Sequence, residues 1–169
     1  MNYQLYILCG LPFSGKTTLA KKLVAKLGFI RIDLDEVKFE LFGQGIKDDQ
    51  IDQSGWDRVY QAMYQNIKTA LLKGDTVIHD TGNFTKSERD LVKKIADDLN
   101  LKPLTIFVNT PLAVAKNRWL KNKITKKRFD IAEASFADCA RELEPPAPSE
   151  PHLVFNYNDS VDDWINKNF

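Results

Sequence analysis

Short apolar runs alternate with segments of helical periodicity along the whole chain. Most of these runs are continuously apolar, as expected for strands that are buried on both faces of a parallel sheet. Five strands are predicted in this way, at Tyr3–Cys9, Phe29–Ile32, Thr76–Asp80, Leu104–Val108 and Leu153–Asn156. The pattern therefore predicts an α/β fold, a three-layer sandwich in which helices cover both faces of a five-stranded parallel sheet.

Helix signals fill the segments between these strands. Leu19, Leu23 and Leu27 lie on one stripe of a helix that follows the first strand. Further helix starts are predicted at Ser54 with Asp57, at Thr85 with Glu88, at Thr110 with Pro111, at Asp130 with Glu133, and near Val161. A proline-rich connection, residues 144–151, leads into the last strand. We expect one domain over residues 1–169.

Composition and charge narrow the class of protein. With 43% hydrophobic and 28% charged residues, the 169-residue chain suits a soluble globular protein with one core. No apolar run approaches the ~20 residues of a membrane span, and the N-terminal run lacks the basic flank of a signal peptide. Cys9 and Cys139 lack the spacing of a metal or redox site, so we expect buried thiols and a cytoplasmic protein. The net charge of +1 argues against a surface that binds nucleic acid over its whole extent.

The strongest chemical signal is a phosphate-binding loop. Residues 10–17 read Gly-Leu-Pro-Phe-Ser-Gly-Lys-Thr and match the pattern GxxxxGK[ST] in full, between an apolar strand and an amphipathic helix. In such a loop the backbone N–H groups face phosphate oxygens, Lys16 holds the β- and γ-phosphates, and the Thr17 hydroxyl binds Mg²⁺. The residues expected to contact ATP here are Gly10, Leu11, Pro12, Phe13, Ser14, Gly15, Lys16, Thr17 and Thr18.

Acidic residues follow the second predicted strand, at the end where open α/β sheets bind ligands. Asp35 is the candidate catalytic base, which would align a substrate hydroxyl and accept its proton as it attacks the γ-phosphate. Asp33 is a candidate substrate-binding residue. Both carboxylates could instead stabilise the N-terminus of the next helix.

The third predicted strand also ends in polar residues. Asp80 closes an apolar run as a Walker B acid does, so it is a candidate for binding Mg²⁺ or the substrate hydroxyl. Thr81 and Asn83 follow it and are either substrate-binding residues or turn residues. His79 should point to the opposite face of the sheet and pack in the core.

A basic segment, Lys116–Arg128, contains seven cationic residues in thirteen and no acid. In a kinase such a segment would act as a lid, here about residues 119–130, that closes over ATP and neutralises the transferring phosphoryl group. Arg118 is the candidate catalytic arginine, and Arg128 is expected to contact ATP as well. For most of the lysines a solvated loop is the simpler interpretation.

Together these motifs resemble the P-loop kinases that include polynucleotide 5'-hydroxyl kinases, zeta-type toxins and chloramphenicol phosphotransferase. The resemblance rests on the phosphate loop, Asp33-x-Asp35, Asp80-Thr81-Gly82-Asn83 with Glu88-Arg89 beyond it, and the Arg118 helix before the lid. It implies a nucleoside-monophosphate-kinase-like fold, a base at the position of Asp35, and lid arginines that contact ATP.

Two departures from that family concern the acceptor and the lid. Members often carry Arg-Asn-x-x-Arg at the lid, whereas Arg118 is followed by Trp-Leu-Lys-Asn, so Lys121, Lys123 or Arg128 would have to replace the second arginine. Gly82 is additional to the Asp-Thr-Asn of a polynucleotide kinase.

The favoured interpretation is an ATP-dependent kinase that acts on a hydroxyl of a small molecule, such as a metabolite, a nucleoside-like compound or an antibiotic. The alternatives are a polynucleotide 5'-hydroxyl kinase, with a nucleic acid partner, and an ATP-binding switch or slow ATPase without an acceptor. The acceptor is expected to bind between residues 39 and 64, where Phe39, Phe42, Trp56 and Tyr60 either line a pocket or belong to the core.

Overall fold

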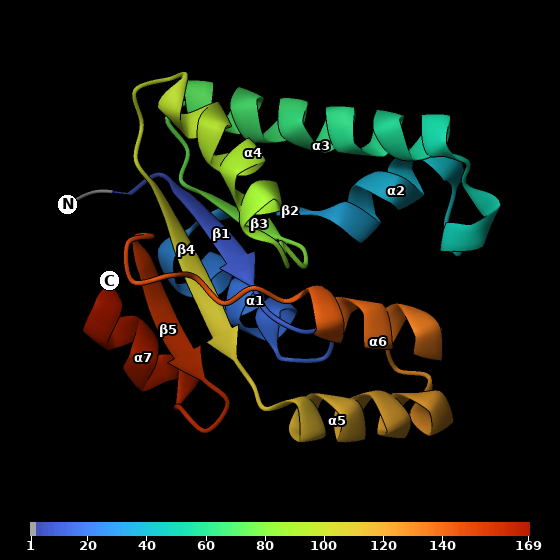
Figure 1. Cartoon of the computed structure of the whole chain (residues 1–169). Helices are drawn as coiled ribbons and strands as arrows, with labels where there is room; N and C mark the ends of the chain where they lie inside the picture. The colour runs from blue at the N-terminus through green and yellow to red at the C-terminus, as the bar shows by residue number, and fades with distance from the viewer. Residues whose placement is uncertain (1–2) are drawn as a thin grey trace.

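A computed structural model describes residues 3–169 and contains one five-stranded sheet (Figure 1). Its strands are β1 (Leu5–Cys9), β2 (Ile30–Asp33), β3 (Val77–Asp80), β4 (Pro103–Asn109) and β5 (His152–Asn156). The spatial order is β2-β3-β1-β4-β5, and every neighbouring pair is parallel. The predicted α/β fold with five parallel strands is therefore confirmed, each strand within a few residues of its predicted bounds.

Seven α-helices and a short 3₁₀ helix, η1 (Asp48–Gln50), connect the strands in the described part of the chain. The α-helices are α1 (Lys16–Leu27), α2 (Leu34–Phe42), α3 (Gln53–Leu72), α4 (Lys86–Asp97), α5 (Leu112–Thr125), α6 (Glu133–Glu142) and α7 (Val161–Asn168). Figure 1 shows α3 and α4 on one face of the sheet and α1 and α7 on the other, while α2, α5 and α6 extend beyond the carboxyl ends of the strands.

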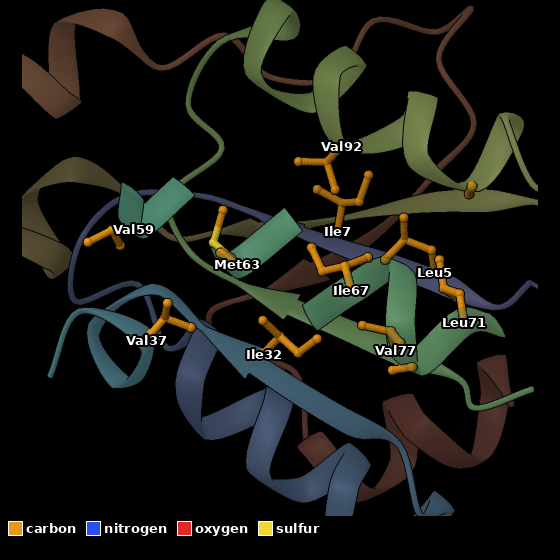
Figure 2. Packing of buried hydrophobic residues seen from close by; sticks show 12 residues of the cluster. Leu5, Ile7, Ile32, Val37, Val59, Met63, Ile67, Leu71, Val77 and Val92 are labelled. Atoms are coloured by element: carbon orange, nitrogen blue, oxygen red, sulfur yellow. The ribbon is translucent and has the colours of Figure 1, made fainter. Parts of the chain in front are cut away.

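The alternation of side chains along β1 divides the core into two layers. Leu5 and Ile7 point toward α3 and α4, and they pack there with Met63 and Val92 (Figure 2). Tyr6 and Leu8 point to the other face and pack in the cluster that α1 and α7 complete. Because β1 is buried on both faces, its sequence is continuously apolar.

Helix N-termini follow the predicted signals with three corrections. Thr85 and Glu88 form the predicted capping box of α4. The cap of α3 is Asp52 rather than Ser54, because the Asp52 carboxylate accepts the Gly55 N–H at 2.8 Å. The N-cap of α5 is Pro111 rather than Thr110, whose hydroxyl instead donates to the Ser14 carbonyl oxygen at 2.9 Å. The start of α6 at Glu133 has no side-chain cap, and Asp130 instead accepts a hydrogen bond from Lys123, 3.0 Å away, in the preceding helix.

The proline-rich connection between α6 and β5 is anchored by a buried charge. Arg89 of α4 and Glu150 are both almost fully buried and form a two-pronged ion pair, with Nε–Oε1 and Nη2–Oε2 distances of 2.8 and 3.1 Å. Arg89 also donates to the carbonyl oxygens of Asn83 and Phe84. One guanidinium group therefore fixes both this connection and the loop after β3.

Of the two cysteines that were expected to be buried, the structure buries one. Cys9 is fully buried and Cys139 is partly exposed, and neither forms a disulfide. Across residues 3–169, every helix is too short or too polar to cross a membrane.

Candidate active site

The phosphate loop connects β1 to α1 at the point where the strand order reverses, because the connection from β1 runs to β2 and that from β3 crosses to β4. Such a reversal opens a crevice at the carboxyl ends of the strands. Gly10 and Gly15 have φ values of 152° and 115°, and Phe13 has a φ of 61°. A Cβ atom on Gly10 would lie 2.8 Å from the Val108 carbonyl oxygen, so only glycine fits there.

The loop leaves polar groups without partners, as an anion site requires. Gly15 is the N-cap of α1 and provides no side-chain cap, so the first amide N–H groups of α1 face the crevice with the positive end of the helix dipole. Among residues 3–169, the Ser14 hydroxyl is the buried side-chain polar atom that lacks a hydrogen-bond partner. A bound phosphate group would satisfy these donors.

Lys16 spans the loop. Its ammonium group donates to the carbonyl oxygens of Gly10 and Leu11, at 2.8 and 2.7 Å. Burial lowers the pKa of Lys16 to about 8, although the negative charge of Asp80 partly opposes this effect. An anion in the loop would stabilise the charged form of this lysine.

Thr17 and Asp80 meet at the start of α1. The Thr17 hydroxyl lies 3.4 Å from Asp80 Oδ1, and Asp80 is buried at the end of β3. No group of three or more carboxylate, histidine or cysteine side chains in the described chain could hold a metal alone. Proteins usually hold Mg²⁺ with one or two carboxylates together with substrate phosphates, so this pair suits Mg²⁺ that arrives with a nucleotide.

Arg31 connects the acids at the ends of β2 and β3, which are direct register partners. Its guanidinium donates to Asp80 Oδ2 at 2.7 Å and also to Asp33 and Glu36. The sequence analysis missed Arg31, although a charged residue inside an otherwise apolar strand is a detectable signal. Asp33 is mostly buried and caps α2 by accepting the Glu36 N–H at 3.0 Å. Burial raises the pKa of Asp33 to about 6, against the opposing charge of Arg31.

Asp35 lies in the first turn of α2, and its side chain is half exposed. Its carboxylate accepts a hydrogen bond from Lys38 at 2.8 Å, and Lys38 donates to Asp48 at the same distance. Lys38 is completely buried, with its ammonium near the rings of Phe39, Trp56 and Phe129. No local sequence pattern indicates that Lys38 is buried.

The basic segment lies against the phosphate loop. Arg118 of α5 donates to the carbonyl oxygens of Phe13 and Ser14 at 3.2 and 2.9 Å. Arg128 donates to the Thr18 hydroxyl at 3.3 Å. Lys123 is paired with Asp130 instead. Of the three candidates to replace the second lid arginine, Arg128 is therefore the one that donates a hydrogen bond to the first turn of α1, next to the loop.

A first cavity of about 380 Å³ opens beside the phosphate loop. Its volume lies within the ~300–1,000 Å³ typical of small-molecule sites. It is lined by Phe13, Ser14, Gly15, Thr18, Arg118, Lys121, Asn122, Thr125, Lys127, Arg128, Phe155, Tyr157, Asp159 and Val161. Sequence reasoning missed the side after β5, where Tyr157 and Asp159 carry no motif.

A second, smaller cavity of about 120 Å³ lies between α3 and the loop after β3. It is lined by Leu34, Tyr60, Met63, Tyr64, His79, Thr81, Gly82, Asn83, Phe84 and Glu88. The Gly82 carbonyl oxygen accepts the Gly10 N–H at 3.3 Å, so one wall of this cavity contacts the phosphate loop.

The predicted residues around this second cavity have different surroundings. Thr81 is partly exposed and lines the cavity. Asn83 is buried, and its amide donates to the Leu8 carbonyl oxygen at 2.7 Å, so it also ties the loop after β3 to β1. His79 is buried beside Met63, which confirms its predicted place in the core. Of the predicted aromatic candidates, Tyr60 lines the cavity.

The fold and the loop together define a P-loop nucleotide-binding protein of the kinase-like type. A family model described as an AAA domain matches residues 5–146. The chain belongs to this family. No curated protein matches the chain.

Solved structures share the fold at low sequence identity. A sugar kinase from Janibacter sp. HTCC2649 is 16% identical, with a TM-score of 0.70 over 98% of this chain and 92% of that chain. Kti12 from Chaetomium thermophilum, in complex with ADP-AlF3, is 19% identical, with a TM-score of 0.74 over 96% of each chain. A gluconokinase from Sinorhizobium meliloti 1021 is 14% identical, with a TM-score of 0.64 over 98% and 90%.

Proposed function

We propose that this protein is an ATP-dependent kinase that transfers the γ-phosphoryl group of ATP to a hydroxyl of a small molecule. The observation that carries this proposal is a pair of cavities, one lined by the phosphate loop and the other by the loop after β3, which is hydrogen-bonded to the phosphate loop through Gly82 and Gly10. A protein that only hydrolyses ATP has no need of the second cavity. The shared fold of a sugar kinase and a gluconokinase supports the same interpretation.

The nucleotide occupies the first cavity, with its phosphates in the loop. Lys16 and the N-terminal amides of α1 bind the β- and γ-phosphates, and Arg118 and Arg128 approach from the basic segment. Thr17 and Asp80 hold Mg²⁺, which when bound neutralises charge on the phosphates. Because Arg118 donates to the loop carbonyls, it is placed to turn toward a phosphoryl group when one is present.

The acceptor hydroxyl enters from the second cavity. Its oxygen attacks the γ-phosphorus while the bond from that phosphorus to the β–γ bridging oxygen breaks, which yields the phosphorylated acceptor and ADP. Asp35, adjacent to the cavity-lining Leu34, aligns the hydroxyl and accepts its proton before releasing it to water. The hydrogen bond from Lys38 holds Asp35 in position for this step.

A transfer assay with labelled ATP over a panel of metabolites, nucleosides, antibiotics and oligonucleotides tests this proposal. We expect transfer to a small hydroxyl compound, no turnover with Lys16→Ala, and loss of transfer with intact ATP binding for Asp35→Asn. Glu40→Gln is the matched control, because Glu40 lies on the same helix and lines neither cavity. Normal turnover by Asp35→Asn would remove Asp35 from the mechanism.

The same panel decides between the alternatives. A polynucleotide acceptor is supported only by the basic segment, which lines the ATP cavity rather than the second one. It would be revealed by oligonucleotide binding that weakens steeply with salt. ATP hydrolysis that no hydroxyl compound changes would favour a switch or slow ATPase.

A further inference from the structure

The lining of the second cavity carries a negative charge and no positive one among the described residues. Among the described lining residues, Glu88 is the only one with a charged side chain. His79 also lines the cavity, but its imidazole is neutral. Burial lowers the pKa of His79 to about 3. No lysine or arginine lines this cavity among residues 3–169. An anionic acceptor would therefore meet a carboxylate and no counter-charge.

Two tyrosines also line the cavity. Tyr60 and Tyr64 lie one helical turn apart on α3, with ring centroids 6.1 Å apart. Burial raises the pKa of both hydroxyls, and the negative charge of Glu88 raises both further. The field of this carboxylate therefore reaches both rings, and aromatic faces beside a carboxylate suit an organic cation.

The carboxylate of Glu88 has capacity for a ligand. It is exposed at the start of α4, and its Oε2 atom accepts the Thr85 N–H at 2.9 Å. Oε1 makes no hydrogen bond within the described residues, so it can accept one from a ligand.

The segment that includes the cavity-lining Leu34 is also acidic. Residues 33–57 contain eight acidic and two basic residues, and one of the two, Lys38, is buried between Asp35 and Asp48. The basic segment, by contrast, carries seven cations, and of these Arg118, Lys121, Lys127 and Arg128 line the first cavity. This division attracts the ATP anion to one cavity and favours a cationic molecule in the other.

We propose that the acceptor is an amino sugar or amino alcohol whose protonated amine binds Glu88 and the rings of Tyr60 and Tyr64. Its hydroxyl then faces Gly82 and the phosphate loop. The volume of about 120 Å³ lies below the range of drug-sized ligand sites, so one small ring or a short chain enters it. This inference rests on the proposed kinase function, and it excludes sugar acids and phosphorylated acceptors.

Matched probes that differ only in charge test the proposal. Glucosamine, glucose and gluconate form one set, and ethanolamine, ethylene glycol and glycolate form a smaller one. We expect phosphoryl transfer from ATP to be fastest for the amine of a set, slower for the neutral compound and undetectable for the acid. A preference for a neutral or acidic probe in both sets would overturn the inference and leave the kinase function standing.

Glu88→Gln provides the decisive variant, because glutamine keeps the capping box of α4 while the charge is removed. We expect kcat/KM for the amine, relative to the neutral probe, to fall about fivefold, as for the loss of a partly exposed ion pair. Asp90→Asn is the matched control: it removes one charge from the same helix but lies outside the cavity lining. An unchanged ratio in Glu88→Gln would contradict the proposed contact.

Binding measurements separate this inference from the kinase function. The six probes are titrated by calorimetry into protein that is saturated with a non-hydrolysable ATP analogue and Mg²⁺. Tighter binding of the amines that Glu88→Gln abolishes, without transfer to any probe, would support the cation site and contradict the kinase function. Equal binding of amines and acids, or no binding of the amines, would overturn the cation site.

Discussion

At the residue scale, the burial of Lys16 conflicts with its proposed role in binding ATP. Burial favours its neutral form, whereas the phosphates of ATP require the ammonium. The carbonyl oxygens of Gly10 and Leu11 stabilise the charge in the free protein only partly. Because the pKa of Lys16 is lowered, ATP binding should depend on pH.

We expect ATP binding to take up protons in mildly alkaline solution. In the free protein the pKa of Lys16 is about 8, so half of the molecules carry a neutral Lys16 at that pH. Bound phosphates raise this pKa. Above pH 8 the complex therefore holds more protons than the free protein. Calorimetry at about pH 8.5 in two buffers of different ionisation enthalpy should show a fractional uptake that fades toward pH 7. Equal heats in both buffers would contradict the prediction.

Arg89 and Glu150 form a buried ion pair, and Arg89 also holds the loop after β3 by hydrogen bonds. Although burial raises the pKa of Glu150, hydrogen bonds from Arg89 and Lys93 lower it to about 2. The stability that this ion pair contributes is thus complete above the ordinary pKa of a glutamate and is lost as the pH falls toward 2.

Arg89→Leu should destabilise the protein by about 3–5 kcal/mol, because it leaves a buried carboxylate without its main partner. Denaturant unfolding gives the free energy of unfolding. The double variant Arg89→Leu with Glu150→Leu should recover part of the loss, since it removes the unpaired charge. A single variant that loses less than about 1 kcal/mol would show that Lys93 alone compensates Glu150.

At the element scale, the proposed lid, about residues 119–130, is joined to α2 through aromatic packing. The ring of Phe129 lies 4.4 Å from the Lys38 ammonium, and its centroid is 6.0 Å from that of Phe39. Lys38 in turn holds Asp35, the proposed base. The position of the proposed lid and that of the base therefore depend on one buried lysine.

Phe129→Ala should release the end of the proposed lid without unfolding the sheet. Trypsin cleavage at Lys126, Lys127 or Arg128 should become several times faster than in the unaltered protein, because local opening exposes these bonds. ATP with Mg²⁺ should slow cleavage again if the segment closes over the nucleotide. Ile124→Ala, at a side chain that is 85% exposed, serves as the control, and equal cleavage of both variants would refute the anchoring role of Phe129.

At the scale of the whole molecule, ligand binding should appear as stability. One ligand at about one hundred times its Kd stabilises the folded state by about 2.7 kcal/mol. For a chain of this size that corresponds to a rise in Tm of about 5–10 °C. ATP with Mg²⁺ should give such a rise, while AMP, which lacks the β- and γ-phosphates, should give much less. A comparable rise with Lys16→Ala would show that the loop does not carry the binding.

The sequence by itself determined the fold class and the phosphate loop. Buried parallel strands must be apolar along their whole length, so runs such as residues 5–9 are visible without a structure. Gly10, Gly15, Lys16 and Thr17 are likewise set by local backbone geometry and by spacing along one short segment. Helix starts were predicted where the cap lies in the same turn, as at Thr85, and misassigned where two polar residues competed, as at Asp52 and Ser54.

Only the tertiary structure decided which of the polar residues work together. Arg31 joins acids from two strands, and Lys38 lies beneath a phenylalanine that is 91 positions later in the chain. Glu88 lines the same cavity as two tyrosines of another helix. These contacts connect residues far apart in sequence, and their burial depends on packing that no local pattern records. The phosphate-loop motif can thus be recognised from local sequence, whereas the shape and charge of the proposed acceptor cavity depend on how α2, α3 and α4 pack together.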